Sequence, residues 1–327
     1  MSEFRTDVLS EPAYRIYAIL VTYNPASGEL ERALAAVMPQ VQGTVVVDNG
    51  SSPGLEHRLP PGAGQRIQFL CLGANYGIAA ALNRGIEWAR SQGATHVLLL
   101  DQDSEPAPDM VKRLHAGLRA LERQGVCVAA VGPFHWDPRL APRSAPSRPF
   151  VRRWGVMIRR MACKGREDLL PVSHLITSGS LIPVPVLDQV GPMREELFID
   201  YVDVDWALRA DRVGLALYGV CSARMRHTIG RQAYDIPALG YPLPMRTPER
   251  NYYLFRNAVL LYGQPSVPLG WKVADASRLL LRLGFTLLFG TPRWRQLDMI
   301  FRGITDGLRR RAGPMPPTFF AARARGQ

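Results

Sequence analysis

Acidic residues gather in two short stretches of the sequence, and each stretch has the composition of a site for a charged substrate. In the first, Asp101 and Asp103 follow the apolar run His96–Leu100. Two carboxylates on one short loop suit Mg²⁺ or Mn²⁺, ions that proteins commonly share with substrate phosphates. An exposed acidic turn is the alternative, because D-x-D is a short pattern that recurs by chance.

The second stretch places Asp200, Asp203 and Asp205 among apolar and aromatic neighbours. A carboxylate in a partly apolar pocket can serve as a general base, because burial disfavours its charged form. The alternative is the start of a helix, where acidic side chains cap amides and complement the helix dipole. We favour the base for Asp203 and the helix start for Asp205.

His227, in the string R-M-R-H-T-I-G, is a third candidate. A neutral imidazole can ligate a metal and could complete a site begun by Asp103. From the residues alone, a structural or surface histidine is the alternative.

These candidates need a scaffold, and the first half of the chain predicts one by alternating apolar strands with amphipathic helices. The expected strands are Tyr17–Thr22, Gly43–Asp48, Ile67–Leu72 and His96–Leu100. The expected helices are Glu29–Met38, Ile78–Gln92 and Met110–Arg123. Continuous apolar strands that alternate with helices predict a doubly wound α/β fold, with a parallel sheet covered on both faces. Farther along, we expect an irregular surface loop over 135–170, a strand or loop at Ser173–Ile182, and a helix at Ala207–Val213.

Three of the predicted strands end in polar residues: T-Y-N-P after the first, D-N-G-S-S after the second, and D-Q-D-S after the fourth. Ligands of such sheets bind beyond the carboxyl ends of the strands. Turn chemistry explains any one of these loops alone. Three together favour a binding edge.

Composition narrows the class of protein. The chain has 327 residues, a net charge of +12 and 47% hydrophobic residues, which excludes disorder for most of its length. Its four cysteines form no C-x-x-C pair, which argues against a zinc ribbon and a disulfide-dense scaffold and fits a reducing compartment. We expect neither a secretory signal nor a transmembrane helix.

Positive charge is concentrated at the C-terminal end. From Arg246 onward there are fourteen Lys and Arg residues against four carboxylates. Val267–Arg311 is expected to be helical, and Leu279–Phe289 has the mixture of apolar residues and arginine of a segment that lies on an anionic membrane. A helical pair packed on the core is the alternative. A nucleic-acid-binding protein is a more distant alternative, without a recognised motif. A nucleotidyltransferase would usually show a Gly-rich, Lys-containing N-terminal loop, which Val21–Pro25 lacks.

Several strings occur in an order typical of one enzyme family: V-T-Y-N-P, V-V-D-N-G-S, N-Y-G-I-A-A-A-L-N-R-G, L-L-L-D-Q-D-S, S-G-S, E-E-L-F-I-D-Y-V-D-V-D-W, R-H-x-I-G and R-N-Y-Y-L-F-R-N. From Ile16 to Arg311 the chain resembles the inverting family 2 glycosyltransferases. Among them it resembles bacterial rhamnosyltransferases of O-antigen, exopolysaccharide and rhamnolipid synthesis. The resemblance implies the GT-A nucleotide-diphospho-sugar transferase fold, and the basic helical segment described above would follow it.

The resemblance also implies roles for single residues. Asp48 would accept a hydrogen bond from N3–H of thymine or uracil. Asp101 would hold the ribose or the metal-bound diphosphate, and Asp103 and His227 would bind Mg²⁺ or Mn²⁺, with Asp101 as a further candidate ligand. The remaining contacts to the nucleotide sugar would come from Thr22, Tyr23, Asn24, Asn75, Gly77, Asn83 and Gln102.

The catalytic base implied by the resemblance is Asp203, which matches the second acid of the family's E-D motif. Val202 stands where that motif has glutamate, so Asp200 is the second candidate for the base. The base would deprotonate an acceptor hydroxyl for direct attack on the anomeric carbon, with inversion of its configuration.

The implied reaction is transfer of L-rhamnose from dTDP-L-rhamnose to a glycolipid or a lipid-linked oligosaccharide. UDP-galactofuranose and a UDP-hexose are the alternative donors. We expect an N-terminal tail (1–15), a glycosyltransferase domain (16–264), an amphipathic helical segment (265–311) and a basic tail (312–327). The expected location is cytoplasmic, peripheral on the inner face of the bacterial plasma membrane.

Overall fold

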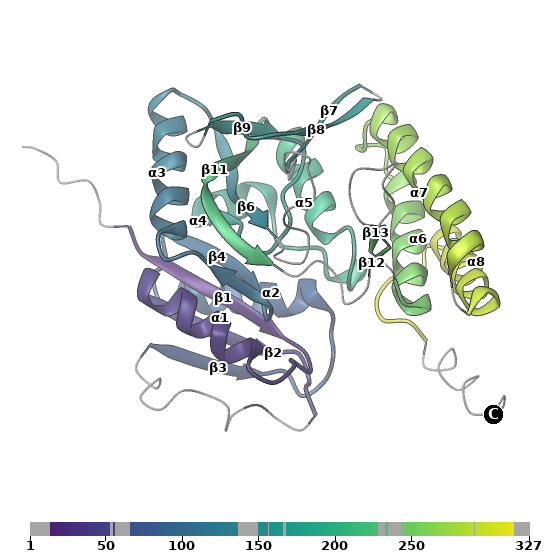
Figure 1. Cartoon of the computed structure of the whole chain (residues 1–327), viewed down its shortest axis with the longest axis horizontal. Coiled ribbons are helices and arrows are strands. Elements are labelled where there is room, and N and C mark those ends of the chain that lie inside the picture. Colours follow the sequence, from purple (N-terminus) through teal and green to yellow (C-terminus); the bar gives the residue numbers. More distant parts are fainter. Residues whose placement is uncertain are drawn as a thin grey trace, which may run out of the picture.

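The computed structural model describes residues 14–52, 55, 66–136, 150–155, 157–165, 168–227, 233–234, 243–244, 246–290 and 292–316. It consists of a central mixed sheet flanked by helices, with a separate layer of helices beside it (Figure 1). The expected α/β architecture is therefore confirmed.

The N-terminal half of the sheet is parallel and follows the predicted pattern. Its strands are β1 (Ile16–Thr22), β2 (Gly43–Asp48), β3 (Ile67–Cys71) and β4 (His96–Asp101), in the order β3-β2-β1-β4. In this register Thr22 pairs with Asp48, and Val21 pairs with Asp101. The polar strand ends thus lie side by side at one edge.

The other half of the sheet mixes strand directions. It contains β5 (Ser104–Pro106), β6 (Val128–Trp136), β9 (Leu169–Val172), β10 (Leu181–Pro183) and β11 (Ala216–His227). Strand β10 runs antiparallel between β4 and β6, while β6 and β11 are parallel. The short strand β5, which follows β4, pairs antiparallel with the end of β11.

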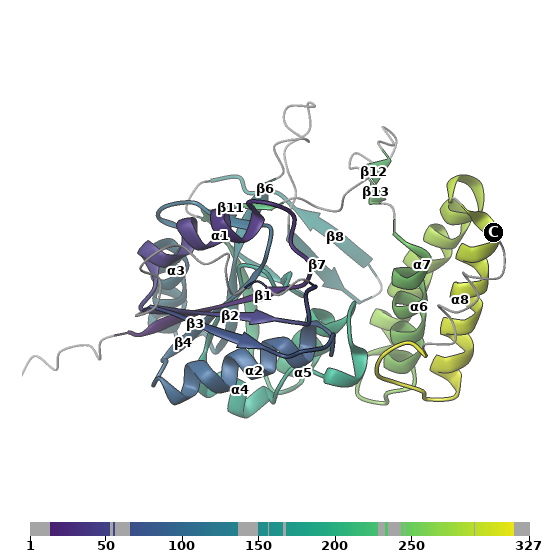
Figure 2. The same ribbon diagram turned by 90° about the horizontal axis from the view of Figure 1, so that it is seen from below.

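Helices cover both faces of the sheet because successive strand residues point to opposite faces. Ala18 and Leu20 pack with α1 (Glu29–Val37) and α3 (Met110–Arg123). Ile19 and Val21 belong to the core on the other face, with α2 (Ile78–Ser91), α4 (Val184–Val190) and α5 (Val202–Arg212). Figure 2 shows these two helical layers on either side of the sheet.

The segment 135–170, expected to be an irregular loop, is more ordered than predicted. It contributes the end of β6, the hairpin β7 (Phe150–Trp154) and β8 (Met157–Met161), and the start of β9. Arginine-rich strands carry little apolar periodicity, so the sequence pattern could not reveal them. Residues 137–149 lie outside the described part.

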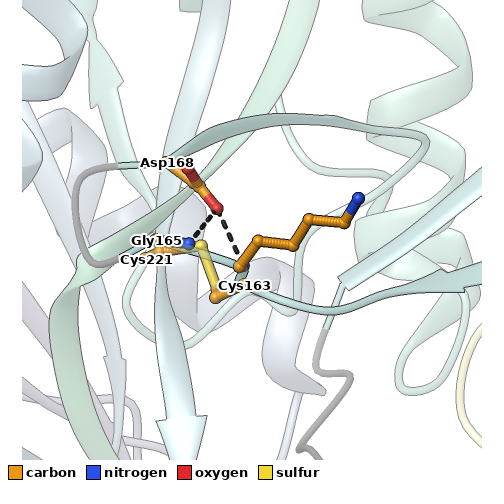
Figure 3. The surroundings of a disulfide bond; sticks show 5 residues. Cys163, Gly165, Asp168 and Cys221 are labelled. Atoms are coloured by element: carbon orange, nitrogen blue, oxygen red, sulfur yellow. Dashed lines mark hydrogen bonds between the residues drawn. A yellow bond between two sulfur atoms is a disulfide. The ribbon is translucent and has the colours of Figure 1, made fainter.

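Cys163 and Cys221 form a disulfide between the end of the hairpin and β11, which does not fit the reducing compartment that the cysteine pattern suggested (Figure 3). Beside it, the carboxylate of Asp168 accepts the N–H groups of Lys164 and Gly165, and the Asp168 carbonyl accepts the N–H of Cys221. The two cysteines are 58 residues apart, a separation from which sequence spacing predicts no pairing.

The C-terminal part forms a layer of α6 (Pro248–Tyr262), α7 (Leu269–Phe289) and α8 (Arg293–Leu308). Helix α6 lies nearest the sheet and α8 farthest from it in both views (Figures 1 and 2). Two short strands, β12 (Ala233–Tyr234) and β13 (Leu243–Pro244), pair just before this layer. Within the described residues, none of the helices combines the length and the hydropathy needed to span a bilayer.

Candidate active site

The ends of β1 and β2 are joined through the carboxylate of Asp48. This side chain is fully buried. It accepts a hydrogen bond from Thr22 Oγ1 at 3.1 Å and bonds from both the N–H and the hydroxyl of Ser51. The structure therefore uses Asp48 to shape the loop after β2, and its contact with the base of a nucleotide stays a prediction.

The ends of β1 and β4 are joined through Gln102, whose Oε1 accepts the N–H of Tyr23 at 2.8 Å. Asn24 links the same loop to β2, because its Oδ1 accepts the N–H of Ser52. The Tyr23 side chain is exposed and available to a ligand. Three loops that are distant in sequence thus form one hydrogen-bonded edge, as their strand-end positions predicted.

The loop before α2 adjoins this edge. Asn75 Oδ1 accepts hydrogen bonds from Asn49 Nδ2 and from the N–H of Gly77. Gly77 has a φ of +89°, and a Cβ there would lie 2.5 Å from the carbonyl oxygen of Phe198. Only glycine permits both this conformation and this close approach. Gly77 therefore brings the loop against the acidic segment near residue 200.

Asn83 lies deeper than its expected place beside the donor. It is buried in α2, donates to the carbonyl of Met193 and to the carboxylate of Glu195, and accepts the N–H of Met193. These bonds fasten α2 to the start of the acidic segment. A direct contact between Asn83 and a ligand stays a prediction.

Asp101 and Asp103 follow β4 beside the S-G-S segment. The N–H of Asp101 donates to Ser178 Oγ at 3.0 Å, and the hydroxyls of Ser178 and Ser104 are 2.5 Å apart. Strand pairing sets the backbone of His227 opposite Ser104, the residue after Asp103. The pairing of β5 with β11 thus brings the backbone of His227, which is distant in sequence, next to the loop that carries Asp101 and Asp103.

The donor types at these positions, two carboxylates and an imidazole, fit Mg²⁺ or Mn²⁺. The side chain of His227 lies outside what the structure describes. Among the described residues, no three His, Cys, Asp or Glu side chains are gathered closely enough to hold an ion.

The acidic segment is held in an unusual backbone conformation. Phe198, Asp200 and Tyr201 all have positive φ angles, near +64°, which is uncommon for residues other than glycine. Helix α5 then begins at Val202, five residues earlier than expected, so Asp203 lies in its first turn. Such conformations persist only where surrounding contacts determine them.

Those contacts come from α6. Asn257 is fully buried, and its Nδ2 lies 2.8–2.9 Å from the carbonyl oxygens of Leu197, Ile199 and Asp200. Arg256, which is also buried, donates to the carbonyls of Glu196 and Leu197. Two neighbouring side chains of α6 thus satisfy the backbone of the strained segment.

Helix α7 supports the same segment from its other end. The hydroxyl of Tyr201 donates to Asp275 Oδ2 at 2.6 Å, and Arg278 donates to both Asp275 and the Tyr201 hydroxyl. Tyr262 also donates to Asp275. Tyr201 is therefore fixed two residues before Asp203.

Asp200, the second candidate for the base, is occupied by two arginines. Arg246 and Arg250 approach its oxygens at 2.5–2.9 Å, and its side chain is 7% exposed. Burial alone would raise the pKa of Asp200, but the two guanidinium groups outweigh burial and lower it. A carboxylate paired in this way is a weak base.

Asp203 has the opposite environment. Burial raises its pKa, and the charge of Asp200 adds to that effect, whereas His174 and the N–H of Val204 only partly oppose it. Burial lowers the pKa of His174. The geometry and electrostatics therefore favour Asp203 over Asp200 as the proton acceptor.

Arg250 connects this acidic segment to the sheet edge. Burial would lower its pKa, but Asp200, Asp101 and Asp203 together raise it. One guanidinium thus lies within electrostatic range of acids from both stretches noted in the sequence. A cation at this place can attract a diphosphate.

Sequence reasoning missed Arg246, Arg250, Asn257, His174 and Ser178. Arg250 and Asn257 stand in the string R-N-Y-Y-L-F-R-N, which carried the resemblance without suggesting a role. Nothing in the sequence linked His174 to Asp203. Asp205 lies in the first turn of α5, as the favoured helix-start role required, and this buried residue forms ion pairs with Arg209 and Arg194.

Comparison with known proteins identifies the family to which this site belongs. The family model described as Glycosyl transferase family 2 matches residues 17–189, which include the sheet edge and the Asp101–Asp103 loop. The chain belongs to glycosyl transferase family 2. It is 32% identical over 302 residues to the dTDP-rhamnosyl transferase RfbF of Shigella flexneri, covering 89% of this chain and 97% of the relative.

A more distant relative of this family 2 glycosyltransferase is the low-salt glycan biosynthesis hexosyltransferase Agl10 of Haloferax volcanii, at 25% identity over 73% of this chain and 75% of the relative. Among solved structures, S. aureus TarS 1-349 in complex with UDP-GlcNAc aligns over 94% of this chain and 83% of that one. Its TM-score is 0.55, at 14% identity. GalNAc-T7 with UDP, GalNAc and Mn²⁺ aligns over 65% of this chain and 43% of that one, with a TM-score of 0.51 at 14% identity. These likenesses confirm the expected GT-A fold.

Proposed function

We propose that this glycosyltransferase moves L-rhamnose from dTDP-L-rhamnose to a hydroxyl of a glycolipid or lipid-linked oligosaccharide, with inversion at the anomeric carbon. The observation that carries the donor is the likeness to the Shigella transferase, which extends over nearly all of both chains. The sheet edge around Asp48, Tyr23 and Gln102 would receive the nucleoside, and Arg250 would attract the diphosphate.

The proposed base is Asp203. Its carboxylate would take the proton of the acceptor hydroxyl as that oxygen attacks the anomeric carbon. The C–O bond to dTDP breaks on the opposite face, and the departing diphosphate carries away the electron pair. Because the donor is β-linked, the product is an α-L-rhamnoside. The paired state of Asp200 and the raised pKa of Asp203 support this assignment.

Asp103 and His227, with Asp101 as a further candidate, would hold Mg²⁺ or Mn²⁺. When bound, such an ion neutralises charge on the leaving diphosphate. The register of β5 against β11 supports this grouping.

The proposed location is the inner face of the cytoplasmic membrane, where a lipid-linked acceptor would be found. The excess of positive charge after Arg246 supports this proposal. The Cys163–Cys221 disulfide does not, because cytoplasmic proteins seldom keep disulfides. In a reducing cytoplasm we expect the two thiols to be free.

The experiment is a transfer assay with dTDP-L-rhamnose, Mg²⁺ or Mn²⁺, and acceptors that include a monorhamnolipid and a lipid-linked oligosaccharide. Mass spectrometry would detect the product, and NMR would assign its anomeric configuration. We expect an α-L-rhamnoside. Transfer with retained configuration would contradict the mechanism, and preferential transfer from a UDP-sugar would contradict the donor.

A further inference from the structure

The turn between α7 and α8 carries an exposed apolar cluster. Leu287, Leu288 and Phe289 end α7, and Trp294 follows in the first turn of α8; we call these four residues the α7–α8 tip. Leu288 is 66% exposed and Trp294 is 84% exposed. Large apolar side chains gathered on a surface mark a site of interaction, whereas single exposed ones are ordinary.

Arginines surround the tip. Arg293 is exposed and donates to the carbonyl of Leu288 at 3.1 Å, which closes the turn. Arg295, on the other side of Trp294, forms an ion pair with Glu249 of α6. Tryptophan and arginine both combine an apolar body with a polar end, and this combination suits the boundary between lipid headgroups and acyl chains.

The tip lies at the same end of the helical layer as the active site. Arg295 Nη2 contacts Glu249 Oε1 at 2.7 Å, and Gln296 Nε2 donates to the carbonyl of Arg246 at 3.1 Å. Arg246 and Arg250, on either side of Glu249, hold Asp200. A few residues in direct contact therefore connect Trp294 to the acidic segment.

We propose that the α7–α8 tip inserts into the surface of an anionic lipid bilayer and so sets the active site at the level of a lipid-borne acceptor. The lipid-borne acceptor in this inference rests on the proposed function, whereas membrane binding by the tip is argued from the exposed side chains and their contacts alone. A second copy of the chain is the less suitable occupant. The sequence from Arg246 onward carries an excess of ten positive charges, and Arg293 beside the tip is exposed. Positive charge at this end of the chain attracts anionic headgroups and disfavours contact with the same region of a second copy.

The test is co-sedimentation of the full chain with phosphatidylcholine vesicles, with and without phosphatidylglycerol. Wild type should bind the anionic vesicles and bind those of phosphatidylcholine alone more weakly. Leu288→Glu and Trp294→Glu should each lower the partition coefficient at least about tenfold, because each replaces apolar contact area by a charge that the headgroups repel.

Leu308→Glu is the matched control. Leu308 is 72% exposed on the same helix, but it lies about 20 Å from Trp294, at the other end of α8. We expect this variant to bind like wild type. Loss of binding equal to that of Trp294→Glu would overturn the tip as the contact site.

Two further results would overturn the proposal. One is wild-type protein that sediments with neither vesicle. The other is a wild-type dimer, detected by light scattering, that does not bind vesicles and that the substitution Trp294→Glu dissociates. Hydrolysis of dTDP-L-rhamnose without lipid distinguishes failure of membrane binding from failure of the proposed function. The tip variants should hydrolyse the donor at the wild-type rate. If wild-type protein does not hydrolyse the donor, that result counts against the proposed function and not against membrane binding.

Discussion

At the scale of single residues, two acids three positions apart have opposite environments. Asp200 is held by Arg246 and Arg250, whereas Asp203 is desolvated beside His174. From the sequence, Asp200 and Asp203 were both candidates for the base, because both are carboxylates in an apolar stretch. The choice between them could not come from the sequence, because the arginines lie about fifty residues farther along the chain.

The substitution Asp203→Asn removes the proposed proton acceptor with little change in shape. We expect kcat to fall by roughly 10²–10⁴, with the affinity for dTDP close to that of wild type. Rates from a transfer assay and calorimetry with dTDP would measure the two effects. Wild-type turnover in this variant would show that the base is a different group.

The pH dependence follows from the direction of the pKa shift. A base acts when deprotonated, so activity should rise as the pH rises through the pKa of Asp203. Because that pKa is raised, the acidic limb of log kcat against pH should lie above the usual carboxyl value of about 4. A limb at or below that value would instead match Asp200, whose pKa is lowered.

At the scale of elements, hydrophobic periodicity predicted β1 to β4 and α1 to α3 to within about one residue, but it missed β5 and β6. It succeeded because β1, β2 and β4 are almost entirely buried, which gives continuous apolar runs, and because the helices have one apolar side. It failed at β7 and β8, whose residues are rich in arginine, and at the start of α5. Before α5, Phe198, Asp200 and Tyr201 take positive φ angles, and contacts with α6 hold this segment.

Helix α6 should therefore affect catalysis through Asn257. Asn257→Leu removes the amide that binds three carbonyls of the acidic segment, so Asp203 should lose its position. We expect kcat to fall about tenfold or more, because small displacements of a catalytic group are costly, while the KM for the donor changes little. Steady-state kinetics would measure kcat and the KM for the donor separately.

Asn251→Leu is the matched control for that variant. Asn251 is also buried in α6, but its Nδ2 donates to Gln296 of α8 and not to the acidic segment. Thermal unfolding should show both variants destabilised, with only Asn257→Leu impaired in kcat per folded molecule. An equal loss of kcat in both would mean that α6 acts only through overall stability.

At the scale of the whole molecule, residues from two parts of the chain form the active site. The matched family region supplies the sheet edge, and the acidic segment with its α6 and α7 supports comes after residue 189. Motif strings indicated the family and its fold. They could not show that the C-terminal helices hold the segment that carries the candidate base, since these contacts join residues 57 to 74 positions apart.

The central claim is that this family 2 glycosyltransferase uses dTDP-L-rhamnose as its donor. The most direct test is calorimetric titration with dTDP-L-rhamnose, UDP-galactofuranose and UDP-GlcNAc, with and without Mn²⁺, together with measurement of nucleotide release. We predict binding and release that are selective for dTDP-L-rhamnose and strengthened by the metal. Preference for either UDP-sugar, or binding of none of the three, would contradict the claim.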